Sequence, residues 1–187
     1  MTAHTPPGPH PLLNFLLLQA AWFVAVLGAA HQLNWPALTA VSAVLLWHCL
    51  SASRALAELK LIGCVTLLGL TIELLNVRLG WMEARGTVAP FLPAPWLVAL
   101  WSLFAAGLNV SLRWLQSHRL GAAIAGAVAG PAAYAGGARL DALAFDRPVP
   151  ALLVLSVCWA VALPLMLWLA GRFNGVAPLS STGRVSP

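Results

Sequence analysis

The chain has 187 residues, of which 60% are hydrophobic and only 8% are charged, and its formal net charge is +5. Soluble domains carry about 25% charged residues, so this composition excludes an ordinary soluble protein. The ten Lys and Arg residues are scattered singly, whereas nucleic-acid binding needs clustered cations that neutralise phosphates. We therefore expect a membrane protein whose cations face lipid headgroups, with no nucleic-acid partner.

Six apolar runs follow one another along the chain, and each approaches the ~20 residues that cross a ~30 Å bilayer core as a helix. The runs are Leu12–Ala30, Pro36–Leu50, Leu61–Leu75, Trp96–Leu112, Leu120–Gly136 and Val149–Ala170. They predict an all-α, polytopic transmembrane bundle of about six spans, with five as the alternative count. We expect one membrane domain over residues 12–172, between disordered tails at 1–11 and 173–187.

The two ends of the predicted bundle differ in their content of cations. The end that carries both tails holds six Lys or Arg, and the other end holds four. The positive-inside rule then favours cytoplasmic termini. No Lys or Arg precedes the first apolar run, as one would precede the core of a secretory signal, so we expect a retained first span.

The fifth run is dominated by Gly and Ala, which makes it the least hydrophobic of the six. Gly126 and Gly130 form the small-xxx-small pattern that lets helix backbones approach closely in lipid. Pro131 removes a helical hydrogen bond, so we expect a kink there. Because little in this run favours contact with lipid, we expect the helix to be buried inside the bundle.

Glu73 is the only acid inside an apolar run, and a charge at the centre of a membrane helix costs ~2.5–3.5 kcal/mol. Asn76 follows at i+3 and shares its helix face. One interpretation is a proton-accepting or headgroup-binding carboxylate that Asn76 orients. The other is a structural carboxyl group bonded to a neighbouring helix, with Arg78 or Arg139 as its partner.

When the predicted spans are aligned across the membrane, other polar side chains lie at the same depth as Glu73. Tyr134, Arg139 and Asp141 then lie near the non-cytoplasmic rim. The hypothesis is a single pocket in which Glu73 and Tyr134 are the candidate catalytic residues. Its candidate binding residues are Asn76, Arg78, Arg139 and Asp141. Such a set would hold an anionic headgroup or pass protons to a substrate.

A second polar set lies toward the cytoplasmic end of the predicted bundle. Asn14 and His48 lie on the first two spans, and Asn109 with Arg113 forms an i, i+4 pair on the fourth. Buried amides commonly join membrane helices through hydrogen bonds, so we assign Asn14 and Asn109 to helix packing with Gly126, Gly130 and Pro131. His48 and His118 lie too close to helix ends to favour a haem pair.

Signatures of cofactor and metal chemistry are missing from the sequence. The three cysteines are isolated within apolar runs, and no CxxC or His/Cys metal spacing occurs. There is also no GxSxG, HExxH or phosphate-binding glycine loop. The deeper tryptophans, Trp22, Trp101 and Trp159, suit either core packing or a carotenoid or quinone platform. We expect no cofactor and no metal.

Several stretches together resemble the small bacterial membrane proteins grouped as domain of unknown function 2878. These are Asn14-Phe15, Gln19–Ala30, Pro95-Trp96, Leu100–Phe104, Ser111–Leu115, Gly126–Leu140 (with its Gly-Pro-xx-Tyr-x-Gly core) and Trp159-Ala160. The resemblance implies a multi-pass protein of the Gram-negative inner membrane and a weak link to enzymes that modify membrane fatty acids. The family pattern has glycine where this chain has Asp141, which argues against a family role for Asp141.

Three functional hypotheses follow. The first is an accessory in membrane-lipid metabolism that uses the rim around Glu73 and Tyr134. The second is a small transporter or flippase in which Glu73 couples to protons. The third is a structural subunit of a membrane complex, held by the close-packing Gly126 and Gly130. The expected partners are membrane lipids, together with other membrane proteins or a second copy of the chain in the third case.

Overall fold

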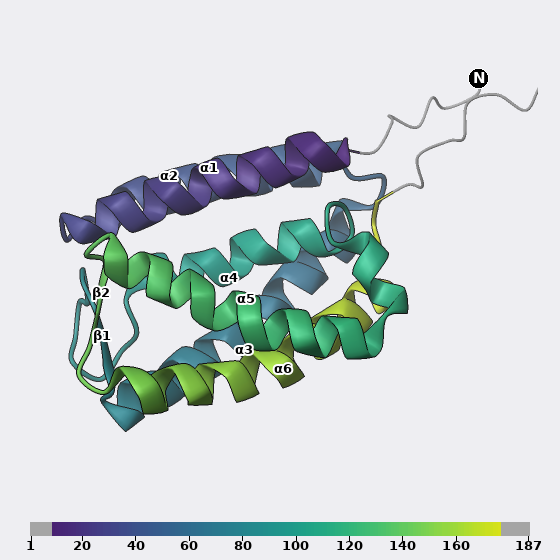
Figure 1. Ribbon diagram of the computed structural model, residues 1–187. Coiled ribbons are helices and arrows are strands. Elements are labelled where there is room, and N and C mark those ends of the chain that lie inside the picture. Colours follow the sequence, from purple (N-terminus) through teal and green to yellow (C-terminus); the bar gives the residue numbers. More distant parts are fainter. Residues whose placement is uncertain (1–8, 177–187) are drawn as a thin grey trace, which may run out of the picture.

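Six α helices build the protein in the computed structural model, which describes residues 9–176. They are α1 (Pro11–Ala30), α2 (Trp35–Ser51), α3 (Ala55–Leu79), α4 (Pro95–Leu108), α5 (Arg119–Arg139) and α6 (Pro148–Arg172). A short 3-10 helix, η1 (Arg113–Ser117), and the strands β1 (Met82–Ala84) and β2 (Leu143–Phe145) complete the fold. The expected all-α bundle is confirmed (Figure 1).

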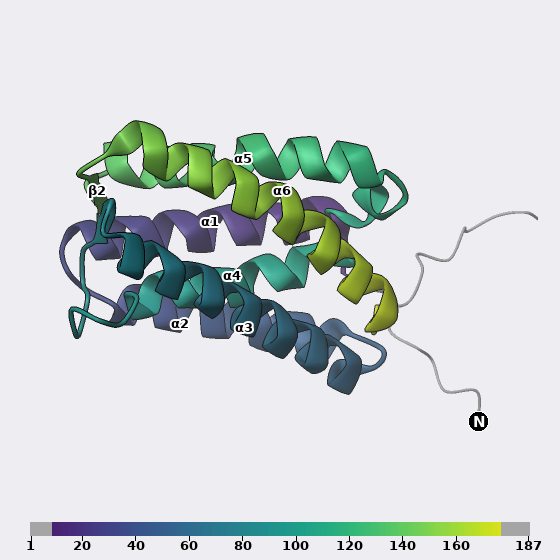
Figure 2. The same ribbon diagram turned by 90° about the horizontal axis from the view of Figure 1, so that it is seen from below.

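Four of the six helices, α1, α3, α5 and α6, are long and apolar enough to cross a membrane, while α2 and α4 are apolar but shorter. The chain is therefore a multi-pass membrane protein. Its helices run roughly along one common direction, with most loops gathered at the two ends (Figures 1 and 2). The surface that would face lipid carries large hydrophobic side chains such as Leu46, Val128 and Val157, each more than 60% exposed.

Two helix boundaries differ from the sequence prediction in ways that matter for the polar groups. Helix α3 begins at Ala55, before the apolar run, which places Glu58 in the first turn of the helix, where its side chain is buried. Helix α4 ends at Leu108, where the amide of Gln116 donates to the free Leu108 carbonyl over 3.0 Å. The predicted helical pairing of Asn109 with Arg113 is therefore wrong: Asn109 caps α4, and Arg113 begins η1.

The centre of the bundle is α4, whose side chains are mostly buried among α1, α2, α3 and α6. The expectation that α5 is the enclosed helix is wrong, because Ile124 and Val128 on α5 are 59% and 66% exposed. Helix α5 instead packs along α6 on the outside (Figures 1 and 2). The more hydrophobic α4 takes the interior because its large side chains supply more buried apolar area.

Small residues allow α5 and α6 to pack closely. A Cβ added at Gly126 would overlap the Trp159 carbonyl, and one added at Gly130 would overlap the Trp159 ring. Pro131 lies inside α5, one residue later, and Figure 1 shows α5 changing direction along its length. The sequence pattern of small residues thus lies at the α5–α6 contact.

A two-stranded antiparallel ribbon closes one end of the bundle. Strand β1 follows α3 and strand β2 precedes α6, with Met82 opposite Phe145 and Ala84 opposite Leu143. Asp141 adopts a φ of 63° just before β2, in the left-handed region that favours glycine, and it forms an ion pair with Arg85 over 2.7 Å.

The opposite end of the bundle is closed by the residues that follow α6. Residues 173–176, at the start of the expected C-terminal tail, pack against the first turn of α3, where the Arg54 amide donates to the Gly175 carbonyl over 3.0 Å. At the N-terminus, the His10 side chain accepts from the Leu12 amide and caps α1. The remainder of the two expected tails, residues 1–8 and 177–187, lies outside the described residues.

Candidate functional site

Glu73 is 1% exposed and lies at the centre of a hydrogen-bond network that joins three helices. Its Oε1 accepts from Trp101 Nε1 of α4 over 3.0 Å and from the Tyr134 hydroxyl of α5. Its Oε2 accepts from Asn76 Nδ2 of α3 over 3.2 Å. Three donors satisfy the carboxyl group at a depth of about 9 Å from the end of α3, six residues away at Leu79.

Two stacked indoles hold this network in place. The Trp101 and Trp159 rings lie parallel, with centroids 4.7 Å apart and planes inclined by 19°. Gly69 of α3 packs on the outer face of Trp101, and Gly130 of α5 packs on Trp159, since a Cβ at either glycine would overlap the ring. The stack fixes the Trp101 N–H against Glu73 because neither indole has room to turn.

An apolar cavity of about 470 Å³ lies beside the network and is lined mainly by residues of α1, α4 and α5. Trp101 and Tyr134 line it with their rings while their polar atoms bond Glu73, which itself does not line the cavity. Its other aromatic lining residues are Phe15, Trp22, Trp96, Phe104 and Trp159. The volume lies in the ~300–1,000 Å³ range of ligand pockets.

The predicted rim pocket forms only in part. Glu73, Asn76 and Tyr134 come together, whereas Arg78 and Arg139 are exposed, and Asp141 pairs with Arg85 in the loop region. Within residues 9–176 no cation bonds Glu73, so neither Arg78 nor Arg139 is the partner that the structural interpretation named. The network can hold the cavity wall, or exchange a proton through the Tyr134 hydroxyl.

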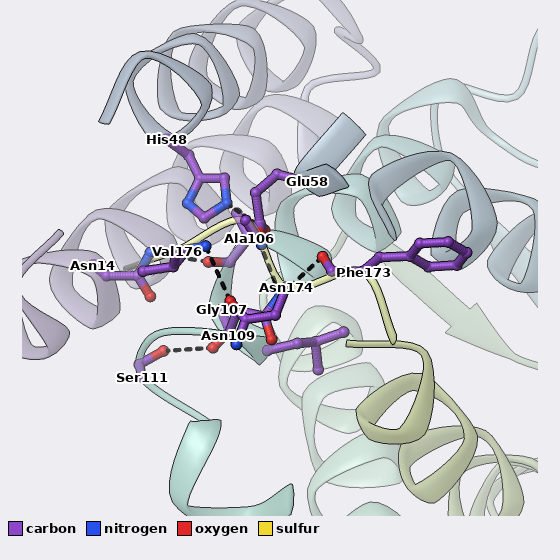
Figure 3. Close-up of polar contacts among 12 residues, drawn as sticks. Asn14, His48, Glu58, Ala106, Gly107, Asn109, Ser111, Phe173, Asn174 and Val176 are labelled. Carbon is purple, nitrogen blue, oxygen red and sulfur yellow. Dashed lines mark hydrogen bonds and ion pairs between the residues drawn. The ribbon is translucent and has the colours of Figure 1, made fainter. Parts of the chain in front are cut away.

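A second buried carboxyl group, Glu58, lies at the other end of α3 and is 0% exposed (Figure 3). Its Oε2 pairs with His48 Nε2 over 2.9 Å. Its Oε1 accepts from Asn109 Nδ2 over 3.0 Å and from the Gly175 amide over 2.6 Å. This Glu58 network joins α2, α3 and α4 to the segment after α6. It accounts for His48 and Asn109 as helix-joining groups.

Two buried polar atoms in this half of the bundle have no hydrogen-bond partner among residues 9–176. Asn14 Nδ2 donates to the Ala106 carbonyl over 3.1 Å, but Asn14 Oδ1 is buried without a partner. His48 Nδ1 is likewise buried and unpaired. The other histidine considered for haem, His118, is exposed and bonds Ser117 and Trp114, so the two histidines do not face one site.

Sequence reasoning missed Glu58 and Gln19. Glu58 falls in a stretch with Arg54 and Lys60 that is typical of a polar connector, so only its burial in the fold distinguishes it. Gln19 is an uncharged polar residue in the middle of the first apolar run, and this signal could have found it. In the structure Gln19 lines the cavity. No cluster of three or more His, Cys, Asp or Glu suited to a metal occurs within the described residues.

A model of the family described as protein of unknown function (DUF2878) matches residues 11–165. The chain belongs to this family. The match confirms the resemblance inferred from the sequence stretches. Several residues in those stretches, including Gln19, Trp22, Trp101, Tyr134 and Trp159, line the cavity. No curated protein and no solved structure matched the chain.

Proposed function

We propose that this member of the DUF2878 family is a bacterial inner-membrane protein that binds a membrane lipid by one hydrocarbon chain and acts as an accessory in membrane-lipid metabolism. The observation that carries the proposal is the apolar cavity between α1 and α5. The exposed residues in its lining mark its open side: they are Phe15 and Gln19 on α1 and Ala129, Ala132 and Ala133 on α5. In a bilayer that side faces acyl chains.

The dimensions of the cavity support a chain-shaped ligand. Its lining extends along α1 from Phe15 to Val26, a distance of about 16 Å at 1.5 Å per residue. Half of a ~30 Å hydrocarbon core is ~15 Å, the depth that one acyl chain occupies in one leaflet. A chain entering from the lipid would therefore fill the cavity along its length.

Glu73 serves this function by fixing the wall of the cavity. Its carboxyl group accepts hydrogen bonds from the polar atoms of Trp101 and Tyr134. These atoms therefore point toward Glu73, and the apolar ring surfaces face the ligand. Pockets for apolar ligands need such walls, because loosely held side chains lose conformational entropy on binding. In this proposal Glu73 and Tyr134 position groups and do not react.

The binding step can be tested by filling the cavity with a large side chain and measuring how much lipid co-purifies with the protein. Ala133→Trp would place an indole in the open side, whereas Val128→Trp adds the same group on α5 at a 66% exposed position outside the lining. Native mass spectrometry should show bound lipid on the wild type and on Val128→Trp, and at least a severalfold loss on Ala133→Trp. Equal lipid on all three would overturn the proposal.

The pathway can be tested in cells. Deletion of the gene should change the fatty-acid or phospholipid profile, and the wild-type chain should restore it while Ala133→Trp does not. An unchanged lipid profile would contradict a role in lipid metabolism. It would favour the alternative of a structural subunit, for which the close α5–α6 packing at Gly126 and Gly130 is the relevant feature.

A proton-coupled transporter or flippase is the second candidate function. The observation that favours it is a buried carboxyl group with no cation bonded to it, linked through the Tyr134 hydroxyl to a residue of the cavity wall. Intramembrane acids of this kind commonly mark proton pathways. This candidate predicts pH-dependent lipid movement in proteoliposomes that Glu73→Gln abolishes, and an absence of such movement would contradict it.

A further inference from the structure

The cavity has two chemically different ends. Toward the β ribbon it is closed by Trp96, Leu97 and Leu143, and all three are buried hydrophobic residues. Toward the end near the Glu58 network it is lined by Ser111, with Gln19 along the same side on α1. A ligand with one polar group and one apolar chain would therefore enter with a defined direction.

Ser111 is the hydrogen-bonding residue at this end of the lining. Its hydroxyl donates to the Gly107 carbonyl over a long 3.5 Å, and its oxygen can still accept a hydrogen bond from a ligand. Asn14, whose Oδ1 has no partner within the described residues, is 0% exposed and does not line the cavity, so it lies behind this wall.

Gln19 adds a second hydrogen-bonding group to the same half of the cavity. It is exposed, lines the cavity, and makes no hydrogen bond within the described residues. A primary amide in the hydrocarbon core of a membrane is unfavourable unless something pairs with it. Its carbonyl and NH₂ can each bond a hydroxyl group, which both donates and accepts.

Building on the proposed function, we propose that the ligand is an uncharged lipid whose hydroxyl-bearing headgroup lies against Gln19 and Ser111, with its chain directed toward Trp96 and Leu143. A hydroxyl group both donates and accepts, so it can pair with the Gln19 amide and with the Ser111 oxygen, whereas a carboxylate or phosphate would enter a cavity that no cation lines among the described residues. Among membrane lipids this pattern selects the acylglycerol class with free hydroxyl groups over fatty acids and over esters without a donor.

Three probes with the same 18-carbon chain test the inference. Monooleoylglycerol carries hydroxyl donors, methyl oleate carries only acceptors, and oleate carries a negative charge. Purified protein in detergent would be offered all three at equal concentration, and occupancy would be read by native mass spectrometry. We expect monooleoylglycerol to exceed each of the other two by about thirtyfold, because two additional hydrogen bonds contribute ~1 kcal/mol each, or ~2 kcal/mol together.

Variants assign that preference to the polar end of the cavity. Gln19→Leu changes an exposed side chain and should reduce the preference severalfold, and adding Ser111→Ala should abolish it while total chain binding persists. Thr71→Val removes an exposed hydroxyl group of α3 outside the lining and should leave the preference unchanged.

Each remaining outcome contradicts the inference in a recognisable way. Equal binding of monooleoylglycerol and methyl oleate would overturn the headgroup assignment and leave chain binding intact. A preference for oleate would show that the headgroup is anionic, which a lining without cations among the described residues argues against. Binding of none of the three, with no co-purified lipid, would refute the proposed function itself.

Discussion

Helix α3 carries two buried carboxyl groups, Glu58 near its start and Glu73 near its end, and each accepts three hydrogen bonds. The partners differ in kind. Glu58 bonds an imidazole, an amide and a backbone N–H of the segment after α6. Glu73 bonds an indole, a phenol and an amide, and two of these side chains line the cavity.

The comparison shows that a buried carboxyl group can serve two purposes. At Glu58 the donors come from loops and helix ends, so the carboxyl group joins the elements that close the bundle. At Glu73 two of the three donors, Trp101 and Tyr134, are the polar edges of rings that line the cavity, so the carboxyl group shapes a cavity wall. We therefore expect Glu58 to matter most for folding and Glu73 for the ligand.

The largest effect is expected for Glu58→Ala. It would leave His48 Nε2 and the Gly175 amide without their acceptor and Asn109 Nδ2 with only the Phe173 carbonyl, at 3.4 Å, and each buried group left unsatisfied costs about 1–3 kcal/mol. Unfolding in a detergent titration would measure the loss. Glu83→Ala, at an exposed acid, is the matched control and should have no measurable effect. Equal stability of the two variants would contradict the folding role of Glu58.

Gly175→Ala tests the same network without changing its charge. The added Cβ would meet the Arg54 carbonyl and lie 2.9 Å from Glu58 Cγ, and overpacking of this kind costs about 1–3 kcal/mol. Gly171→Ala is the control, because a Cβ there meets nothing within 4 Å and alanine favours the helix. The thermal unfolding midpoint should fall for Gly175→Ala and stay or rise for Gly171→Ala.

Tyr134→Phe removes one donor from Glu73 and keeps the ring that lines the cavity. We expect stability to fall by about 1 kcal/mol, the net value of a typical hydrogen bond, with bound lipid reduced less than twofold. Unfolding in detergent and native mass spectrometry give the two readings. Complete loss of bound lipid in a folded variant would show that the hydroxyl group itself contacts the ligand.

The smallest effect is expected for Glu73→Gln. The amide oxygen can still accept from Trp101 and Tyr134, and a rotated Asn76 can accept from the new NH₂ group. Stability should change by less than about 1 kcal/mol, with lipid occupancy preserved. Glu73→Leu, which offers no acceptor, should lose both stability and bound lipid. If Glu73→Gln alone abolished a pH-dependent lipid movement, the transporter would replace the lipid-binding accessory as the better explanation.

Much of the fold could be predicted from the chain because hydrophobicity in a membrane acts locally. Long apolar runs must satisfy their backbone hydrogen bonds within each segment, so helices were the expected outcome. The residues also indicated the family, the unusual place of Glu73 inside an apolar run and the close packing at Gly126 and Gly130. Asn76 could be joined to Glu73 because their i, i+3 spacing lies within one helix.

Contacts between helices could not be predicted in this way. Depth alone placed Arg78, Arg139 and Asp141 beside Glu73, yet the order of helices in the bundle turns the two arginines outward and pairs Asp141 with Arg85. Trp101 was expected only as a deep tryptophan, and its bond to Glu73 depends on α3 lying against α4. Apolar faces of similar hydropathy do not specify which neighbours they meet.

The amino-acid sequence by itself determined that this is a membrane-embedded helical protein with one conspicuous acid in an apolar run, because solvation energy depends on residues taken one segment at a time. Tertiary structure alone decided that α4 is central, that Glu58 is buried, and that Trp22, Trp101 and Trp159 surround a cavity. These features arise from the shapes of side chains that are distant in sequence, and packing selects among them only when the whole bundle assembles.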